Sequence, residues 1–206
     1  MKKVLSANGF AFLAAIVLLS AAPAQPAQAT GLAAVQGSLA SWIDDPLLLA
    51  AVSIHNEDTA HLSRDELVAM NERWKVEQFV TVKPLTNRYK DCPLSIFLRD
   101  VRDGIGAPVK DIFVFDAKGM IVGHTSNPDA ISHGEAPYFA ETMAAALTAG
   151  EPSVDGQSEA SLQVFHALAE EGEAGVEPLT RLGAPLIDPL TSDVIGTVMI
   201  LAHGAK

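Results

Sequence analysis

Cysteine is nearly absent from this sequence: Cys92 is the only one in 206 residues. A lone cysteine excludes a disulfide within the chain, and no CxxCH motif for haem attachment is present. In an oxidising compartment such a thiol is either buried or joins two copies of the chain. Cys92 precedes Pro93 at a predicted helix start, and free cysteine usually packs as a small core residue, so we predict a buried, inert side chain.

Basic residues are also scarce. Lysine and arginine number 14 against 25 aspartates and glutamates, which gives a formal net charge of −11. Without Lys2 and Lys3 the balance is 12 against 25, or −13. This acidity argues against binding nucleic acid or an anionic membrane surface.

No apolar run is long enough to span a bilayer comfortably. The run Gly9–Ala22 has 14 residues, whereas a membrane helix needs roughly 20. Lys2 and Lys3 precede it, and Ala27-Gln28-Ala29 follows as a small-x-small cleavage site. We predict a cleaved signal peptide at residues 1–29 and one soluble domain at residues 30–206, periplasmic or secreted. The alternative is an uncleaved anchor; a bacterial lipid anchor is disfavoured because no cysteine follows the run.

Motifs for catalysis are missing as well. No serine lies in a GxSxG context, and no histidine pair has HxH or HExxH spacing. A metal site would have to be assembled from His124, His133, His166 and Glu135, and the alternative is that these side chains line a wet cavity through hydrogen bonds. We predict no enzymatic activity, no metal and no cofactor.

The stretch Asp111–Tyr138 is the part around which we expect the chain to fold. Its apolar runs Ile112–Phe115 and Met120–Val122 are rich in β-branched and aromatic residues. The intervening turn Asp116–Gly119 has an aspartate that can bond its own backbone and a glycine that can adopt positive φ, so we predict a β-hairpin. After His124 the chain becomes polar and irregular, which is typical of a connection that walls a pocket.

Helical spacing of apolar residues and caps predict five helices. They are Leu32–Ile43, Pro46–Ile54, Ser63–Gln78, Pro93–Val101 and Pro137–Leu147. The polar residues His55–Asp58 are expected to end the second. Alternating patterns predict strands at Ser161–Leu168, Glu177–Ile187 and Val194–Ala202. This order predicts an α+β fold with a five-stranded antiparallel sheet and long N-terminal helices packed on one side.

Three motifs, in chain order, resemble the Cache family of extracellular sensor domains, which are PAS-like and also called PDC sensors. The first is Trp42–Trp74, the second is DIFVFDAKGMIVGHT at Asp111–Thr125, and the third is Ala184–Val198, in which Pro185-Leu186-Ile187-Asp188 matches the Pro-Ile-x-Asp pattern of the family. The resemblance covers roughly residues 35–202. One branch has a Gly-Asp-Glu tract that here reads Gly134-Glu135-Ala136, so one acidic residue is missing.

The resemblance implies a stand-alone sensor domain that binds a small organic ligand and reports to a membrane receptor or kinase. Alternatives are a periplasmic ligand-binding accessory or carrier protein for transport, and a structural exported domain. Receptors of this family further imply that the N-terminal helix, with its stripe Leu32–Trp42, is a homodimer or partner surface.

Binding is the chemistry that the predicted pocket suits best, because aromatic walls with few polar anchors favour small polar ligands. We predict that the pocket between the sheet and Thr125–Tyr138 is lined by His124, Thr125, His133, Glu135, Tyr138, Phe139, Gln163, Phe165, Arg181 and Asp188. Arg181 could bind a ligand carboxylate through two hydrogen bonds. The resemblance implies that Asp188 faces a ligand amine. The alternatives are a solvated strand residue for Arg181 and a turn former before Pro189 for Asp188.

Overall fold

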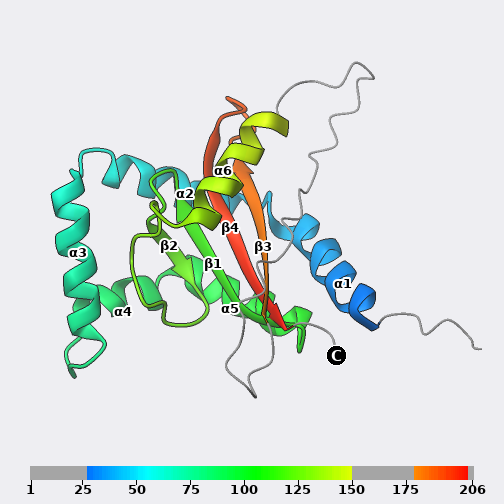
Figure 1. Cartoon of the computed structure of the whole chain (residues 1–206), viewed down its shortest axis with the longest axis horizontal. Helices are drawn as coiled ribbons and strands as arrows, with labels where there is room; N and C mark the ends of the chain where they lie inside the picture. Colours follow the sequence, from blue (N-terminus) through cyan, green and yellow to red (C-terminus); the bar gives the residue numbers. More distant parts are fainter. Residues whose placement is uncertain (1–26, 150–178, 204–206) are drawn as a thin grey trace, which may run out of the picture.

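The computed structural model of this chain describes residues 27–149 and 179–203. The helices in this part are α1 (Ala27–Trp42), α2 (Pro46–Thr59), α3 (Arg64–Glu77), α4 (Pro84–Lys90), α5 (Pro93–Ile105) and α6 (Pro137–Ala149). The strands are β1 (Val109–Asp116), β2 (Ile121–His124), β3 (Leu179–Ile187) and β4 (Val194–His203). They form one antiparallel sheet in the order β2-β1-β4-β3, so the α+β class is confirmed (Figure 1). The predicted strand Ser161–Leu168 lies outside the described residues.

Local caps explain where two of the helices begin. Asp45 accepts a hydrogen bond from the backbone N–H of Leu47 at 2.8 Å, and Pro46 fills the first helical position of α2. At the start of α3, the N–H of Ser63 donates to Glu66 at 2.8 Å and the N–H of Glu66 donates back to the Ser63 hydroxyl at 3.3 Å. This reciprocal capping box was predicted from sequence and is confirmed.

The structure corrects the predicted end of α2 and adds a helix. α2 runs through the polar residues His55–Asp58 to Thr59, because the side chains of His55, Asn56 and Thr59 bond to the sheet. The short helix α4 was not predicted. The backbone N–H groups of Leu85 and Thr86 in this helix donate hydrogen bonds to the carboxylate of Glu77, which lies in the previous helix.

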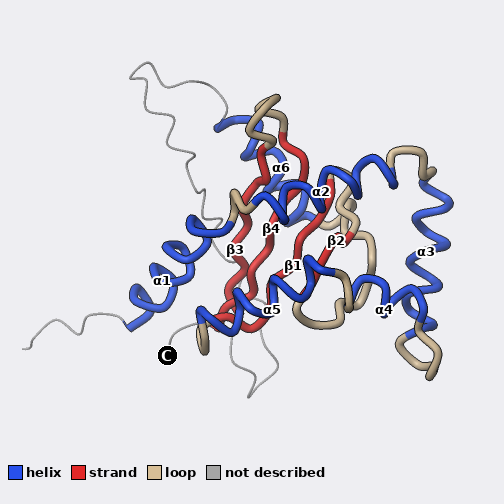
Figure 2. Tube along the Cα trace, turned by 180° about the vertical axis from the view of Figure 1, so that it is seen from behind, coloured by secondary structure: helices blue, strands red, loops and turns tan. Residues whose placement is uncertain are grey.

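The sheet is covered on both faces by different elements. Helices α1, α2 and α5 lie across one face (Figure 2), and α6 crosses the other (Figure 1). The first face packs an aliphatic cluster that includes Val35, Leu39, Trp42, Leu48, Val52, Leu94, Leu98, Ile112, Val114, Leu182, Val198 and Ile200. The second face packs a more aromatic cluster of Trp74, Tyr89, Phe113, Phe115, Met120, Ile121, Ile131, Phe139 and Met199. Successive residues of β1 and β4 therefore alternate between the two clusters.

The stripe predicted as a dimer surface on the N-terminal helix is largely used inside the chain. Val35, Leu39 and Trp42 of α1 are at most 6% exposed and belong to the aliphatic cluster. These three side chains are therefore not available to a partner.

The predicted hairpin is confirmed as β1 and β2. Its turn closes through a hydrogen bond of 3.0 Å from the N–H of Gly119 to the carbonyl of Asp116, with Gly119 at φ 77°. A side chain at Gly119 would also collide with the backbone of Gly134, because the connection folds back over the turn. The N–H of His133 donates to the Gly119 carbonyl at 2.7 Å, which fixes this return. Among the helices described, none has the length and apolar character needed to cross a membrane.

Candidate functional site

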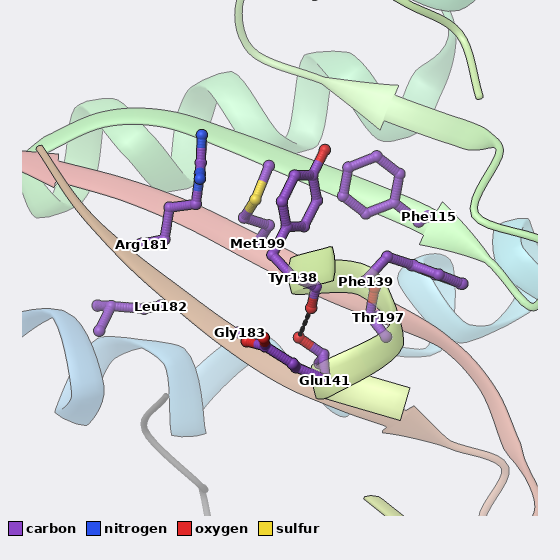
Figure 3. A pocket seen from close by; sticks show the side chains of 10 residues that line it. Phe115, Tyr138, Phe139, Glu141, Arg181, Leu182, Gly183, Thr197 and Met199 are labelled. Atoms are coloured by element: carbon purple, nitrogen blue, oxygen red, sulfur yellow. Dashed lines mark hydrogen bonds between the residues drawn. The ribbon is translucent and has the colours of Figure 1, made fainter. Parts of the chain in front are cut away.

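A small hollow lies between α6 and the face of β3 and β4 that this helix crosses (Figure 3). Its cavity volume is about 30 Å³. That volume has room for about two water molecules, so the hollow is nearly closed in this conformation. It is lined by Phe115, Tyr138, Phe139, Glu141, Thr142, Arg181, Leu182, Gly183, Thr197 and Met199.

Strand register determines which side chains form the sheet side of the hollow. Gly183 of β3 lies opposite Met199 of β4, and Thr197 lies opposite Phe115 of β1. The residues that alternate with these positions along each strand, such as Val114, Ala184 and Val198, belong to the aliphatic cluster on the other face of the sheet. Arg181 is two residues before Gly183 and therefore shares its face. Figure 3 shows Arg181, Met199 and Phe115 along this face.

The first two turns of α6 form the opposite wall. Tyr138 and Phe139 begin the helix, and Phe139 is 7% exposed within the aromatic cluster. The hydroxyl of Thr142 donates to the carbonyl of Tyr138 at 2.7 Å, the bond drawn in Figure 3. This bond uses the hydroxyl of Thr142 inside the helix.

The distinctive contact of the site joins its two walls. The guanidinium carbon of Arg181 lies 5.0 Å from the ring centroid of Tyr138, within cation–π distance. The Tyr138 ring is tilted against Phe115, with centroids 6.5 Å apart. A planar cation is thus positioned beside an aromatic wall at the edge of the hollow.

His133 supports this aromatic wall from behind. Its ring lies 5.1 Å from that of Phe115, and its Nε2 is 2.9 Å from the carbonyl of Ala130. Its Nδ1 bonds the hydroxyl of Tyr138. An Nε2–H donor and an Nδ1 acceptor satisfy both contacts in the neutral ring. Burial, which outweighs the Ala130 bond, lowers the pKa of His133 and favours the same neutral form.

Three of the ten residues predicted for the pocket line the hollow: Tyr138, Phe139 and Arg181. His133 lies behind them, as described above. Gln163 and Phe165 lie outside the described residues.

The other predicted residues lie elsewhere. His124 is 1% exposed and packs edge-on against Trp74, with centroids 6.1 Å apart. The hydroxyl of Thr125 accepts the backbone N–H of Ile112 at 2.8 Å in the sheet. These two positions help hold the hairpin in place and do not reach the hollow wall.

Glu135 and Asp188 lie near the surface of the molecule. Glu135 pairs with Arg64, and both side chains are more than 80% exposed. The carboxylate of Asp188 accepts the N–H of Leu190 at 2.8 Å in the turn between β3 and β4. That bond is the one expected of a turn-forming aspartate.

Sequence reasoning did not identify the residues that form most of the hollow, namely Phe115, Glu141, Thr142, Leu182, Gly183, Thr197 and Met199. One signal was available. In β4 a polar threonine and a flexible methionine, Thr197 and Met199, alternate with the β-branched Val198 and Ile200. This alternation distinguishes the two faces, but only strand register tells which of them α6 covers.

A polar cluster at the hairpin turn was also not predicted. His55 contacts Asp116 through Nδ1 at 3.0 Å and the hydroxyl of Tyr89 through Nε2 at 3.2 Å. Within residues 27–149 and 179–203, no group of three or more His, Cys, Asp or Glu side chains is arranged to hold a metal ion. Cys92 is half-buried and caps α5, where its sulfur accepts the N–H of Ser95 at 3.4 Å.

Comparison with known proteins finds no matching protein-family model and no matching curated protein. Among solved structures, the chain is similar to the sensor domain of the V. cholerae histidine kinase DctB, at 14% identity and a TM-score of 0.34 over 84% of this chain and 56% of that one. It is also similar to the sensory domain of the Campylobacter jejuni chemoreceptor Tlp3 with isoleucine bound, at 11% identity and a TM-score of 0.37 over 84% and 62%. The same domain in complex with L-valine gives 12% identity and a TM-score of 0.36 over 84% and 63%. The chain spans less than two thirds of the length of each of these structures.

Proposed function

We propose that this chain is an exported Cache-type sensor domain that binds a small organic ligand between α6 and the β3–β4 face. The ligand carries a carboxylate, and binding is reported to a membrane receptor or kinase. The observation that carries the proposal is the placement of Arg181 against Tyr138 at the edge of the hollow. The three sequence motifs that resemble the Cache family support it, as does the α+β architecture with an antiparallel sheet.

The ligand class follows from the chemistry of these two walls. A guanidinium group presents a rigid fork of donors that matches a carboxylate, and an aromatic ring beside it holds the fork in plane. Phe115, Phe139 and Met199 provide an apolar surface for the rest of the ligand. An apolar wall with a few polar groups is the usual composition of a small-molecule site. The polar lining here comprises Arg181, Thr142, Thr197 and Glu141, whose carboxylate would repel a carboxylate placed on its own side of the hollow.

Binding must open the hollow, because about 30 Å³ is far below the roughly 300 Å³ of the smallest usual ligand pockets. In this proposal the movable wall is α6, whose Tyr138, Phe139 and Met143 pack against the aromatic cluster of the sheet. A ligand that holds α6 away from β3 shifts the balance between a closed and an open conformer. The partner then responds if it prefers one of the two.

Several finer features belong to the same proposal. They are a signal peptide at residues 1–29, a fifth strand at residues 161–168 that contributes Gln163 and Phe165, and self-association through exposed residues of α1. A carrier for transport would use the same hollow without a signalling partner.

The small volume of the hollow favours a second candidate, a structural exported domain that binds nothing. Native mass spectrometry of the purified protein, before and after unfolding and refolding, separates the two. The sensor proposal predicts extra mass of a small molecule that disappears on refolding and is absent from the Arg181→Met variant. Extra mass retained equally by Arg181→Met would place the ligand elsewhere, and a bare polypeptide mass would favour the structural candidate.

A further inference from the structure

The end of α3 and the loop that joins it to α4 carry a concentration of exposed apolar side chains. Val76, Phe79, Val80 and Val82 are 60%, 90%, 43% and 75% exposed. They are four of the ten large hydrophobic residues that are exposed in the described part of the chain. Figures 1 and 2 show this loop at an extremity of the molecule, on the side opposite α1. Apolar groups gathered on a protruding tip indicate an interaction site.

The loop is held in this form by buried contacts. The carboxylate of Glu77 is 4% exposed and accepts the N–H groups of Leu85 at 3.2 Å and Thr86 at 2.8 Å. Burial alone would raise the pKa of Glu77, but the bonds from Thr86, Leu85 and Arg73 outweigh it and leave the pKa lowered. The ammonium of Lys83 also donates to the carbonyl of Gln78 at 3.1 Å, across the loop. These hydrogen bonds hold the loop in one conformation, so the exposed apolar side chains have a defined position.

The charge around this tip is opposite to that of the whole chain. Residues 72–91 contain five basic residues, Arg73, Lys75, Lys83, Arg88 and Lys90, against three acidic ones, Glu72, Glu77 and Asp91, which leaves a formal charge of +2. The chain as a whole has a net charge of −11. Glu72 pairs with Lys75 at 2.9 Å, and Glu77 pairs with Arg73 at 3.2 Å. Beyond these two pairs, Lys83, Arg88 and Lys90 outnumber the single acidic residue Asp91.

We propose that the Phe79–Val82 tip docks on an anionic lipid bilayer. Aromatic and aliphatic side chains enter the interface, while lysine and arginine beside them meet the lipid headgroups. Each basic residue near such a surface strengthens binding about fivefold. The net acidity of the chain opposes this binding in general, so the local basic cluster orients the protein with this tip toward the membrane.

A second copy of the chain is the less favourable occupant. A convex tip needs a recess in its partner, and the hollow beside α6 has only about 30 Å³ and carries the cation Arg181 at its edge. A bilayer needs no matching recess. The proposal is independent of ligand binding in that hollow.

The test places a reporter at the tip of the full chain. Phe79→Trp puts an indole at a position that is 90% exposed, while the natural Trp42 and Trp74 are 6% and 0% exposed and give a constant background. We expect the emission of Phe79→Trp to shift to shorter wavelength with vesicles of phosphatidylcholine and phosphatidylglycerol at 7:3, and at least tenfold weaker binding with pure phosphatidylcholine. High salt should weaken the anionic response because the attraction is screened.

The matched control is Leu190→Trp. Leu190 is 92% exposed but lies in an acidic turn beside Asp188 and Asp193, so its emission should not change with either vesicle. The proposal is overturned if Phe79→Trp shows no shift with anionic vesicles, or an equal shift with neutral ones. A shift that grows with protein concentration and needs no vesicles would also overturn it and would indicate docking on a second copy.

Discussion

The carboxylate of Asp116 lies 3.0 Å from Nδ1 of His55, although 61 residues separate them in the chain. The same carboxylate accepts the hydroxyl of Thr59 at 2.8 Å and the backbone N–H groups of Lys118 at 2.9 Å and Met120 at 2.8 Å. Its side chain is completely buried. One carboxylate therefore both closes the hairpin turn and attaches it to α2.

We predict that Asp116→Ala lowers the free energy of unfolding by about 3–5 kcal/mol, because it leaves several buried donors without an acceptor. Urea denaturation followed by circular dichroism measures the change. Asp100→Ala, at an exposed position on α5, should change it by less than about 0.5 kcal/mol. A loss under about 1 kcal/mol for Asp116→Ala would show that this carboxylate is not a structural centre.

Gly119 should tolerate no side chain. Gly119→Ala puts a Cβ at φ 77° and against the backbone of Gly134, so we expect a loss of about 3 kcal/mol or more in unfolding free energy. The comparison is Gly37→Ala, in the middle of α1 with nothing within 4 Å, which should stabilise by about 0.5–1 kcal/mol. Thermal denaturation of both variants distinguishes them. Equal effects would mean that the hairpin and its connection do not pack as described.

Acid should destabilise the fold through His124. Burial lowers the pKa of this ring from 6.5 to about 4. Between these pH values the unfolded chain binds a proton that the folded chain does not, so stability falls as pH drops through this window, by about 3 kcal/mol in total. The lowered pKa of His133 acts in the same direction.

The variant His124→Phe should flatten this pH dependence, measured as unfolding free energy at several pH values from 7 to 4. His61→Gln, at an exposed position, should retain the profile of the wild type. Profiles of equal slope for wild type and His124→Phe would contradict the assignment to His124.

Glu77 is predicted to be the acceptor on which α4 depends. Glu77→Ala leaves the N–H groups of Leu85 and Thr86 unpaired in a buried position, which should cost about 1–3 kcal/mol. Glu72→Ala, on an exposed side chain of the same helix, should cost less than about 0.5 kcal/mol. Hydrogen exchange of the α4 amides checks the mechanism, since only Glu77→Ala should speed it.

Features set by neighbouring residues could be predicted from the sequence. The hairpin follows from Asp116 and Gly119 within a four-residue turn, and the start of α3 follows from Ser63 and Glu66. Features set by distant partners could not. The polar residue His55 is typical of a helix end, but α2 continues through it because its ring makes a hydrogen bond to the carboxylate of Asp116 across the fold.

The same reason limits prediction of the site. Arg181 was predicted because a guanidinium group can bind a ligand carboxylate through two hydrogen bonds. Gly183 and Thr197 could be assigned to the site only from the pairing of β3, β4 and β1. Glu135 was predicted from its place in a motif, but the connection carries it to Arg64 on the surface. A one-residue change in the register of a strand would turn each of its side chains to the opposite face of the sheet.

A thermal-shift screen of small carboxylates and matched amines, run on wild type and Arg181→Met, tests the binding claim most directly. At a ligand concentration about 100-fold above the dissociation constant, stabilisation of about 2.7 kcal/mol should raise the melting temperature by roughly 5–10 °C. We predict such a rise for at least one carboxylate with the wild type, none for its amine counterpart, and none with Arg181→Met. A flat response of the wild type to every carboxylate, or an equal rise in Arg181→Met, would contradict the account.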